Sequence, residues 1–410
     1  MRASVYLFAH DLRDEGVEVV LDRLQAADVD GVVMAAAYHH SRDVFPHNPR
    51  RKIVYLEGGC VYFHPQPERY AGAPLQPRVA RVASEADPFA ALCDAARARG
   101  MRVGAWVVAL HNTRLAFEMP DAAPRTAFGD PLLNSLCPAH PAVRRFATAL
   151  IGDVARYAPD SIALEAVSYM GFDHGYHHER SFVPLSPNVR FLLGLCFCQH
   201  CLSAVRRAQV DAERVQRYVR ERVEALFASA ANETHESEVD EDALRAACDG
   251  ELGRFLDARL QVVTSLVQEV AATVRAESAG IDVTYLDPSG ATLGYATGRP
   301  TTQASAASIA WRDGVDLAGV GQACGGVGML AYFAEQPRLR GEVQAYQQQL
   351  APDTRLEVLL RPMAPDVNSG AALAARLETL RGLDIRDVGF YHYGFMRLES
   401  LDWIAQALRA

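Results

Sequence analysis

Eight short β-rich runs, each followed by a helical pattern, restrict the fold of this chain more than any other feature. The runs occupy residues 4–10, 31–39, 102–111, 161–168, 282–286, 315–319, 355–361 and 387–392. Such alternation predicts βα units and a parallel sheet. Several runs are apolar along nearly their whole length, as strands buried on both faces are. Eight units predict a closed (β/α)8 TIM barrel, with an open doubly wound sheet as the alternative.

The chain is longer than a barrel requires. It has 410 residues, whereas a minimal barrel needs roughly 250, and the surplus falls after the second and fourth strands. We expect a long ordered loop over residues 41–86. Over residues 169–251 we expect an insertion that contains a cysteine motif, a helix near 212–231 and an acidic break at 233–242. We expect one barrel domain over residues 1–410, with both excursions at the carboxyl-terminal face where barrel enzymes carry their active sites.

Charge and hydropathy limit the class of partner. The formal net charge of −9 argues against nucleic acid or an anionic membrane surface as the main partner. No stretch approaches the roughly 20 apolar residues of a membrane span, and the first ten residues lack a signal-peptide pattern. We therefore expect a cytoplasmic protein that acts on a small molecule, and a homo-oligomer is left open.

Three of the eight cysteines form a CxCxxC motif at Cys196, Cys198 and Cys201. This spacing suits one tetrahedral metal ion held by thiolates. A closed site needs a fourth ligand, and our choice is Cys137, which lies before a helix in the loop after the third strand. The alternatives are His200, Cys60, Cys93, Cys248 and Cys324.

The expected occupant of this cysteine site is a structural Zn²⁺ that connects the loops after the third and fourth strands. Cysteines of a reducing compartment serve as metal ligands more readily than as disulfides. A catalytic zinc is disfavoured because a closed thiolate site leaves no open position for water or substrate. Buried thiols without a metal are the other interpretation.

Two carboxylates lie at the ends of neighbouring predicted strands. Glu165 interrupts an apolar strand near its end, where an unpaired charge is costly, and Asp287 ends the next strand. Adjacent strands lie about 4.8 Å apart, so the two could reach the separations used in glycoside hydrolysis. Alternatively, Glu165 pairs with Arg361 and Asp287 forms a turn before a proline. Asp366 is a weaker substitute for Asp287.

Polar and aromatic side chains gather at strand ends and in the loops that follow. Imidazoles, amides and rings suit a sugar, whose hydroxyl groups need donors and acceptors while its face stacks on rings. A second, open metal site built from histidines and carboxylates is the rival interpretation. The candidate substrate-binding residues are His39, His111, Asn112, Asp173, His174, His177, His178, Arg361, Tyr391 and His392.

With these residues, the chain resembles glycoside-hydrolase-like barrels, especially the family 42 β-galactosidases and uncharacterised glycosyl hydrolase-like proteins. The shared order is a Cys-Pro-x-x-Pro turn from Cys137, a strand-end Glu165 and the CxCxxC motif. The resemblance implies a structural zinc on these cysteines and an acid/base role for Glu165. Three features depart from the family. Leu164 stands where the family has Asn, the family's nucleophile Glu at the end of strand seven has no counterpart, and the gap between Glu165 and the cysteine cluster is longer.

We therefore expect a glycoside hydrolase-like enzyme that cleaves a small carbohydrate or glycoconjugate with two carboxylates, Glu165 and Asp287, whose roles stay open. One alternative is a metal-dependent lyase, isomerase or hydrolase acting on a sugar-like substrate. The other is a non-catalytic carbohydrate-binding barrel, which the missing strand-seven Glu favours.

Overall fold

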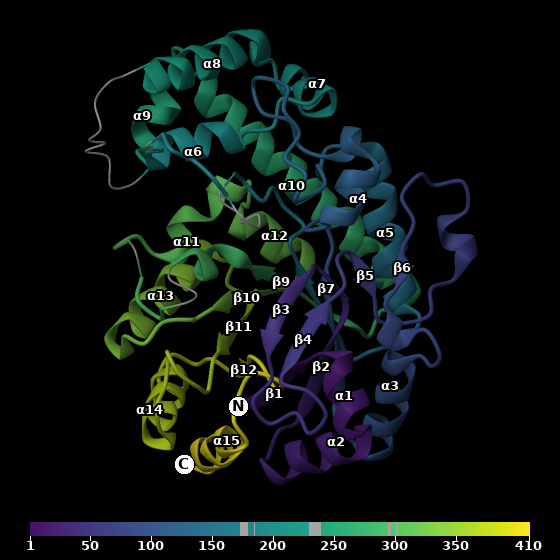
Figure 1. Ribbon diagram of the computed structural model, residues 1–410. Helices are drawn as coiled ribbons and strands as arrows, with labels where there is room; N and C mark the ends of the chain where they lie inside the picture. Colours follow the sequence, from purple (N-terminus) through teal and green to yellow (C-terminus); the bar gives the residue numbers. More distant parts are fainter. Residues whose placement is uncertain (173–178, 184, 229–238, 294–296, 301) are drawn as a thin grey trace.

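A ring of parallel strands forms the centre of the molecule (Figure 1). The computed structural model describes residues 1–172, 179–183, 185–228, 239–293, 297–300 and 302–410. The barrel strands are β1 (Arg2–Leu7), β2 (Gly31–Tyr38), β7 (Arg102–Val108), β8 (Ser161–Glu165), β9 (Asp282–Asp287), β10 (Gly326–Leu330), β11 (Arg355–Leu360) and β12 (Asp387–Phe390). Parallel pairing of β1 with both β2 and β12 closes the ring. The predicted (β/α)8 TIM barrel is thus confirmed, and an open doubly wound sheet is ruled out.

Helices surround the barrel because the segments between strands bury one face against the sheet. Local sequence sets where they begin: at α3, the Asp87 side chain accepts from the amide of Ala90 and Pro88 occupies the first turn. The outer helices are α1 (Ala9–Glu15), α2 (Val17–Ala26), α3 (Pro88–Ala98), α4 (Thr113–Glu118), α5 (Pro141–Ala155), α10 (Glu251–Glu277), α11 (Ala306–Ile309), α12 (Leu317–Cys324), α13 (Gln336–Gln349), α14 (Gly370–Arg381) and α15 (Glu399–Arg409).

The sixth barrel strand lies elsewhere than predicted. Residues 315–319, expected to be a strand, lead into helix α12, and the strand is β10. Both are short apolar runs, which hydrophobic periodicity cannot assign to strand or helix. Gly325 has a φ of +84° and ends α12, so the chain enters β10 at the next residue.

The long loop predicted after the second strand is present and ordered. It contains a hairpin of β3 (Ser41–Val44) and β4 (Ile53–Leu56), followed by β5 (Cys60–Val61) and β6 (Arg78–Val79). Strand β5 pairs antiparallel with the end of β2. The excursion is thereby attached to the carboxyl-terminal end of the barrel.

The predicted long excursion after the fourth strand is also present. It carries α6 (Pro187–Gly194), α7 (Gln199–Arg207), α8 (Ala212–Ala228) and α9 (Glu241–Ala246), which Figure 1 shows as a helical layer at the top of the picture. Buried side chains of these helices and of the start of α10 form a second hydrophobic cluster. Most of the acidic segment expected to be a break lies outside the described residues. No single described helix is long and apolar enough to span a membrane, although the bent pair of α6 and α7 passes that test when taken together.

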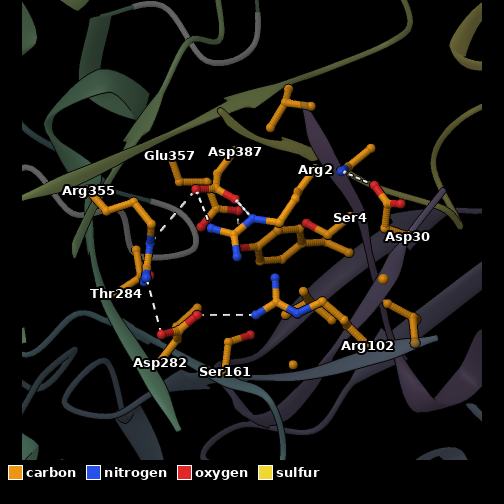
Figure 2. A pocket seen from close by; sticks show the side chains of 18 residues that line it. Arg2, Ser4, Asp30, Arg102, Ser161, Asp282, Thr284, Arg355, Glu357 and Asp387 are labelled. Atoms are coloured by element: carbon orange, nitrogen blue, oxygen red, sulfur yellow. Dashed lines mark hydrogen bonds and ion pairs between the residues drawn. The ribbon is translucent and has the colours of Figure 1, made fainter. Parts of the chain in front are cut away.

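Ion pairs fill the amino-terminal end of the barrel (Figure 2). Arg2 binds Asp387 at 2.6 Å, and Asp282 binds Arg102 and Arg355, each at 3.2 Å. The space left between these side chains is only about 60 Å³. This end therefore holds no room for a sugar-sized ligand.

Candidate active site at the carboxyl end of the barrel

A cavity of about 810 Å³ opens at the carboxyl ends of the strands, between the barrel and the helices inserted after β8. Side chains at the ends of β1, β2, β7, β8 and β12 form its floor, among them Tyr6, Tyr38, Trp106, Glu165 and Tyr391. Its volume lies in the range of small-molecule sites in proteins. The site is therefore where a barrel enzyme would carry its chemistry.

Glu165 ends β8 and points into this cavity. The indole Nε1 of Trp106 on the neighbouring strand β7 donates to Glu165 Oε2 at 2.7 Å. Burial raises the pKa of Glu165 from 4.5 to about 7, and the hydrogen bond from Trp106 opposes this rise. A carboxyl group with a pKa near 7 can both give and take a proton at neutral pH. Ala166, the next residue, has a φ of +53°, a conformation uncommon outside glycine.

Asp287 faces the other side of the sheet. In the pairing of β8 with β9, Glu165 stands opposite Leu286 rather than Asp287, and successive strand residues point to opposite faces. Asp287 is fully buried, with its carboxylate accepting from Tyr346 at 2.6 Å and from the Ser289 hydroxyl at 2.8 Å. Its side chain thus joins β9 to α13 instead of meeting Glu165 across the cavity.

Three of the candidate substrate-binding residues lie in the cavity wall. His39 and His111 stack on each other with ring centroids 4.2 Å apart. Tyr391 lies on the floor, 5.8 Å from the Trp106 ring in an edge-on arrangement. Together they offer ring faces and nitrogen donors or acceptors of the kind that bind sugars.

Three other candidates have structural contacts outside this wall. Asn112 caps α4 by accepting from the amide of Leu115. Arg361 makes a buried ion pair with Asp366 at 2.6 Å. His392 is fully buried with its ring centroid 4.0 Å from that of Phe8. The remaining candidates, Asp173, His174, His177 and His178, lie outside the described residues.

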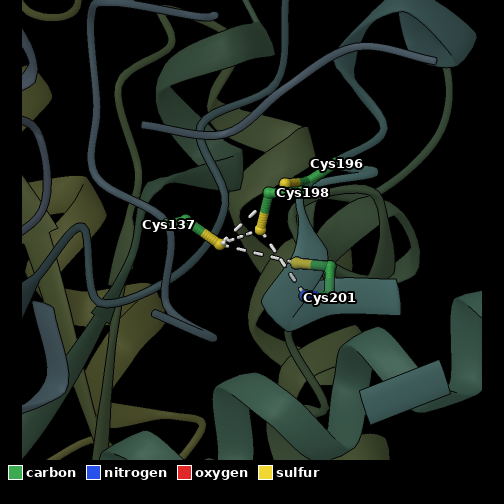
Figure 3. A group of neighbouring side chains, drawn as sticks. All are labelled: Cys137, Cys196, Cys198 and Cys201. Carbon is green, nitrogen blue, oxygen red and sulfur yellow. Dashed lines mark hydrogen bonds between the residues drawn. The ribbon is translucent and has the colours of Figure 1, made fainter. Parts of the chain in front are cut away.

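All four cysteines of the predicted metal site come together (Figure 3). Their sulfur atoms lie within 4.8 Å of one another, and Cys137 Sγ is 3.9, 3.6 and 3.4 Å from the sulfur atoms of Cys196, Cys198 and Cys201. Four sulfurs at 2.3 Å from one tetrahedral ion would stand about 3.8 Å apart. The buried cluster is consistent with a thiolate metal site that connects the loop after β7 to the loop after β8.

Neighbouring groups suit negatively charged sulfur. The backbone amide of Arg125 donates to Cys196 Sγ at 3.3 Å, and that of Cys201 donates to Cys198 Sγ at 3.5 Å. The Tyr169 hydroxyl lies 3.1 Å from Cys201 Sγ. Such donors around metal-bound sulfur orient the ligands and tune the site.

No protein-family model matches this sequence, and no curated protein matches it. Solved structures do match. The β-galactosidase of Halorubrum lacusprofundi has a TM-score of 0.58 at 11% identity, covering 100% of this chain and 58% of that chain. The psychrophilic Marinomonas ef1 β-galactosidase has a TM-score of 0.57 at 11% identity, covering 100% and 59%. The α-L-fucosidase isoenzyme 2 of Paenibacillus thiaminolyticus has a TM-score of 0.53 at 13% identity, covering 100% and 49%.

The chain has a glycosidase-like barrel. It spans between about half and three fifths of the length of these enzymes. At this identity the likeness establishes the fold, and the chemistry of the glycosidase-like barrel has to be argued from its own cavity.

Sequence reasoning missed several polar residues of the cavity wall. Asp43 on the hairpin after β2, Arg259 on α10, and Arg312 and Asp313 in the 3₁₀ helix η5 (Ala310–Asp313) all line it. None lies at the end of a barrel strand, so the strand-end argument did not select them. Tyr6, near the end of β1, could have been found by the strand-end argument that selected Glu165.

Proposed function

We propose that this chain hydrolyses a glycosidic bond of a small carbohydrate or glycoconjugate in the cavity, with Glu165 as the group that transfers the proton. The observation that carries the proposal is the position of Glu165: a carboxyl group with a pKa of about 7, held by Trp106 at a strand end on the floor of a sugar-sized cavity. A general acid in glycoside hydrolysis needs a raised pKa of this kind.

The second carboxylate of the mechanism comes from the wall of the cavity in this proposal. Asp287 is engaged with Tyr346 on the far face of β9, whereas Asp43 and Asp313 line the cavity. In this proposal one of these two aspartates acts with Glu165 as the base or the nucleophile.

The cysteine site has a structural role in the same proposal. Cys137, Cys196, Cys198 and Cys201 would hold Zn²⁺, whose preference for tetrahedral thiolate sites matches the four sulfur atoms. With four protein ligands the ion would have no open position for water or substrate. Its role would be structural, joining two loops at the rim of the cavity. The substrate would be small and intracellular, with a cytoplasmic location for the enzyme.

The metal-dependent alternative has less support from the geometry. Within the described part of the chain, ligand atoms close enough to hold a metal occur at the cysteine cluster. A second ion in the cavity would depend on histidines 174, 177 and 178, which lie outside that part. A non-catalytic carbohydrate-binding barrel is the other alternative, and the turnover experiment below distinguishes it from a hydrolase.

The test is turnover of a panel of α- and β-linked aryl glycosides by the wild type and by Glu165→Gln, Asp43→Asn and Asp313→Asn. We expect Glu165→Gln and one aspartate variant to lose activity by orders of magnitude while folding and metal content persist. The other aspartate variant serves as the matched control. Binding of sugars without turnover of any glycoside would contradict the proposal and support a binding barrel.

A further inference from the structure

Arg259 of α10 is a buried cation in the cavity wall. Its side chain is 2% exposed, and it lines the cavity. Nη2 donates to the carbonyl oxygen of Arg312 at 3.1 Å, and the guanidinium stands over the Tyr169 ring at 4.6 Å from the centroid. Nε and Nη1 are buried without a hydrogen-bond partner. No carboxylate of the described residues lies within the 4.0 Å ion-pair distance of this group.

A guanidinium in this state is costly. Arginine is almost never fully buried unless it is paired, and each buried donor without an acceptor costs free energy. One carbonyl oxygen and one ring face leave most of its five donors unused. Because Arg259 lines the cavity, the acceptor oxygens of a ligand bound there would pair with its guanidinium once the atoms that cover Nε and Nη1 move aside.

Charge is unevenly distributed around the cavity. In the described part of the wall built by residues 187–313, the charged side chains are Arg190, Arg259, Arg312 and Asp313. Elsewhere the described lining carries Asp43 and Glu165. The negative charge of Asp313 offsets part of this positive charge. Burial lowers the pKa of Arg259, and the nearby Asp313 opposes this shift without cancelling it. Among its described residues, this part of the wall therefore carries more cationic than anionic side chains.

We propose that Arg259, supported by Arg190 and Arg312, binds an oxyanion carried by the substrate, so that the cavity takes an acidic sugar. The anion is a carboxylate, as in a uronic acid, or a phosphate on the sugar. Planar guanidinium groups bind both through paired hydrogen bonds. The inference rests on the proposed function in that the same cavity holds the sugar, and it adds the substrate class.

A different role for Arg259 has to be separated from this one. The Tyr169 ring beneath its guanidinium carries the hydroxyl that lies 3.1 Å from Cys201 Sγ. Arg259 could thus compensate the negative charge of the thiolate site. Metal content, measured in every variant, distinguishes the two roles.

The first test measures sugar binding by calorimetry, without turnover. The probes are D-glucuronate, D-galacturonate, D-glucose 6-phosphate and D-galactose 6-phosphate, each against its neutral parent sugar. We expect at least one acidic sugar to bind about tenfold or more tightly than its parent, because a charge-assisted pair forms in a buried site. The uronates and the phosphates separate the two sources of the anion. Equal affinity, or no binding of any probe, overturns the inference.

The second test assigns the preference to Arg259. We expect Arg259→Met to abolish it and Arg259→Lys to weaken it, with metal content unchanged. Arg376→Met is the matched control, because Arg376 is also 2% exposed, donates to the Phe333 carbonyl oxygen at 2.6 Å and stands over an aromatic ring, yet lies outside the cavity wall. Loss of metal in Arg259→Met, with the acidic preference kept in Arg259→Lys, would assign Arg259 to the thiolate site and overturn the inference.

The two proposals fail in different ways. Hydrolysis of neutral aryl glycosides, with no preference for acidic ones, would keep the proposed function and overturn the acidic substrate class. Binding of acidic sugars without hydrolysis of any glycoside would keep the anion site and overturn the proposed function.

Discussion

At the scale of single residues, the pKa of Glu165 is set by two opposing effects: burial raises it and the hydrogen bond from Trp106 lowers it. Trp106→Phe keeps most of the ring and removes the donor, so we expect the pKa of Glu165 to rise further, by on the order of one unit. If Glu165 acts as the acid, the loss of kcat/KM at high pH should move to higher pH in the variant. The measurement is the pH profile of kcat/KM, and an unmoved profile would show that this bond does not tune the acid.

The raised pKa of Glu165 also predicts a pH dependence of stability. A carboxyl group whose pKa is higher in the folded state contributes its full stabilisation of the fold below its unfolded pKa, which is 4.5 for Glu165. This contribution to the free energy of unfolding disappears as the pH rises through about 7. Glu165→Gln removes the buried ionisation. Between pH 4.5 and 8, the free energy of unfolding of the variant should therefore rise relative to that of the wild type by about 3 kcal/mol. Urea unfolding at both pH values measures this, and a constant difference would contradict it. Glu357, whose pKa burial also raises to about 7, is present in both proteins and cancels.

At the scale of elements, Asp287 and Tyr346 connect strand β9 to helix α13. We expect Tyr346→Phe to lower the free energy of unfolding by about 1–3 kcal/mol, because a buried carboxylate loses a donor. Asp287→Asn, which keeps an acceptor for Tyr346, should retain kcat/KM within a few-fold, since its side chain faces away from the cavity. Denaturant unfolding and kinetics measure the two effects. A loss of activity by orders of magnitude in folded Asp287→Asn would restore this residue to the reaction.

The metal site acts on elements as well, because Cys137 precedes α5, Cys196 and Cys198 precede α7, and Cys201 lies in the first turn of α7. Cys198→Ala should release the metal and increase amide hydrogen exchange in α6, α7 and α8, whose packing depends on the joined loops. Cys324→Ala is the matched control, since Cys324 is a buried cysteine on α12 away from the cluster. Metal analysis with hydrogen exchange measures both. One equivalent of metal retained in Cys198→Ala would contradict a four-thiolate site.

Elements also show what the sequence could and could not predict. Seven of the eight strands follow from apolar runs of strand length. The sixth predicted run, residues 315–319, runs into the start of α12, because a short apolar run can form either a strand or a helix. Glu165 and Asp287 look equivalent as strand-end acids, and only the register, with Leu286 opposite Glu165, places them on opposite faces. Three ligands of the cysteine site needed no register, because Cys196, Cys198 and Cys201 are close in sequence and cysteine has few other roles in that spacing. The fourth, Cys137, is 59 residues before Cys196 and was chosen for its position before a helix in the loop after the third strand.

At the scale of the whole molecule, the two ends of the barrel differ in chemistry. The amino-terminal end is filled by ion pairs around Asp282 and Asp387, whereas the carboxyl-terminal end opens into the cavity. The strand order alone predicts which end carries function. The cavity wall could not be predicted, because Arg259 and Asp313 reach it from helix α10 and the 3₁₀ helix η5, more than 90 residues beyond Glu165 in the chain.

The most direct test of the account compares leaving groups in Glu165→Gln. A general acid matters most when the departing oxygen needs a proton, so the variant should lose about a hundredfold to ten-thousandfold in kcat/KM for an alkyl glycoside and far less for a 2,4-dinitrophenyl glycoside. This result would establish Glu165 as the acid of a glycosidase. Equal losses for both leaving groups, or wild-type activity on both, would contradict it.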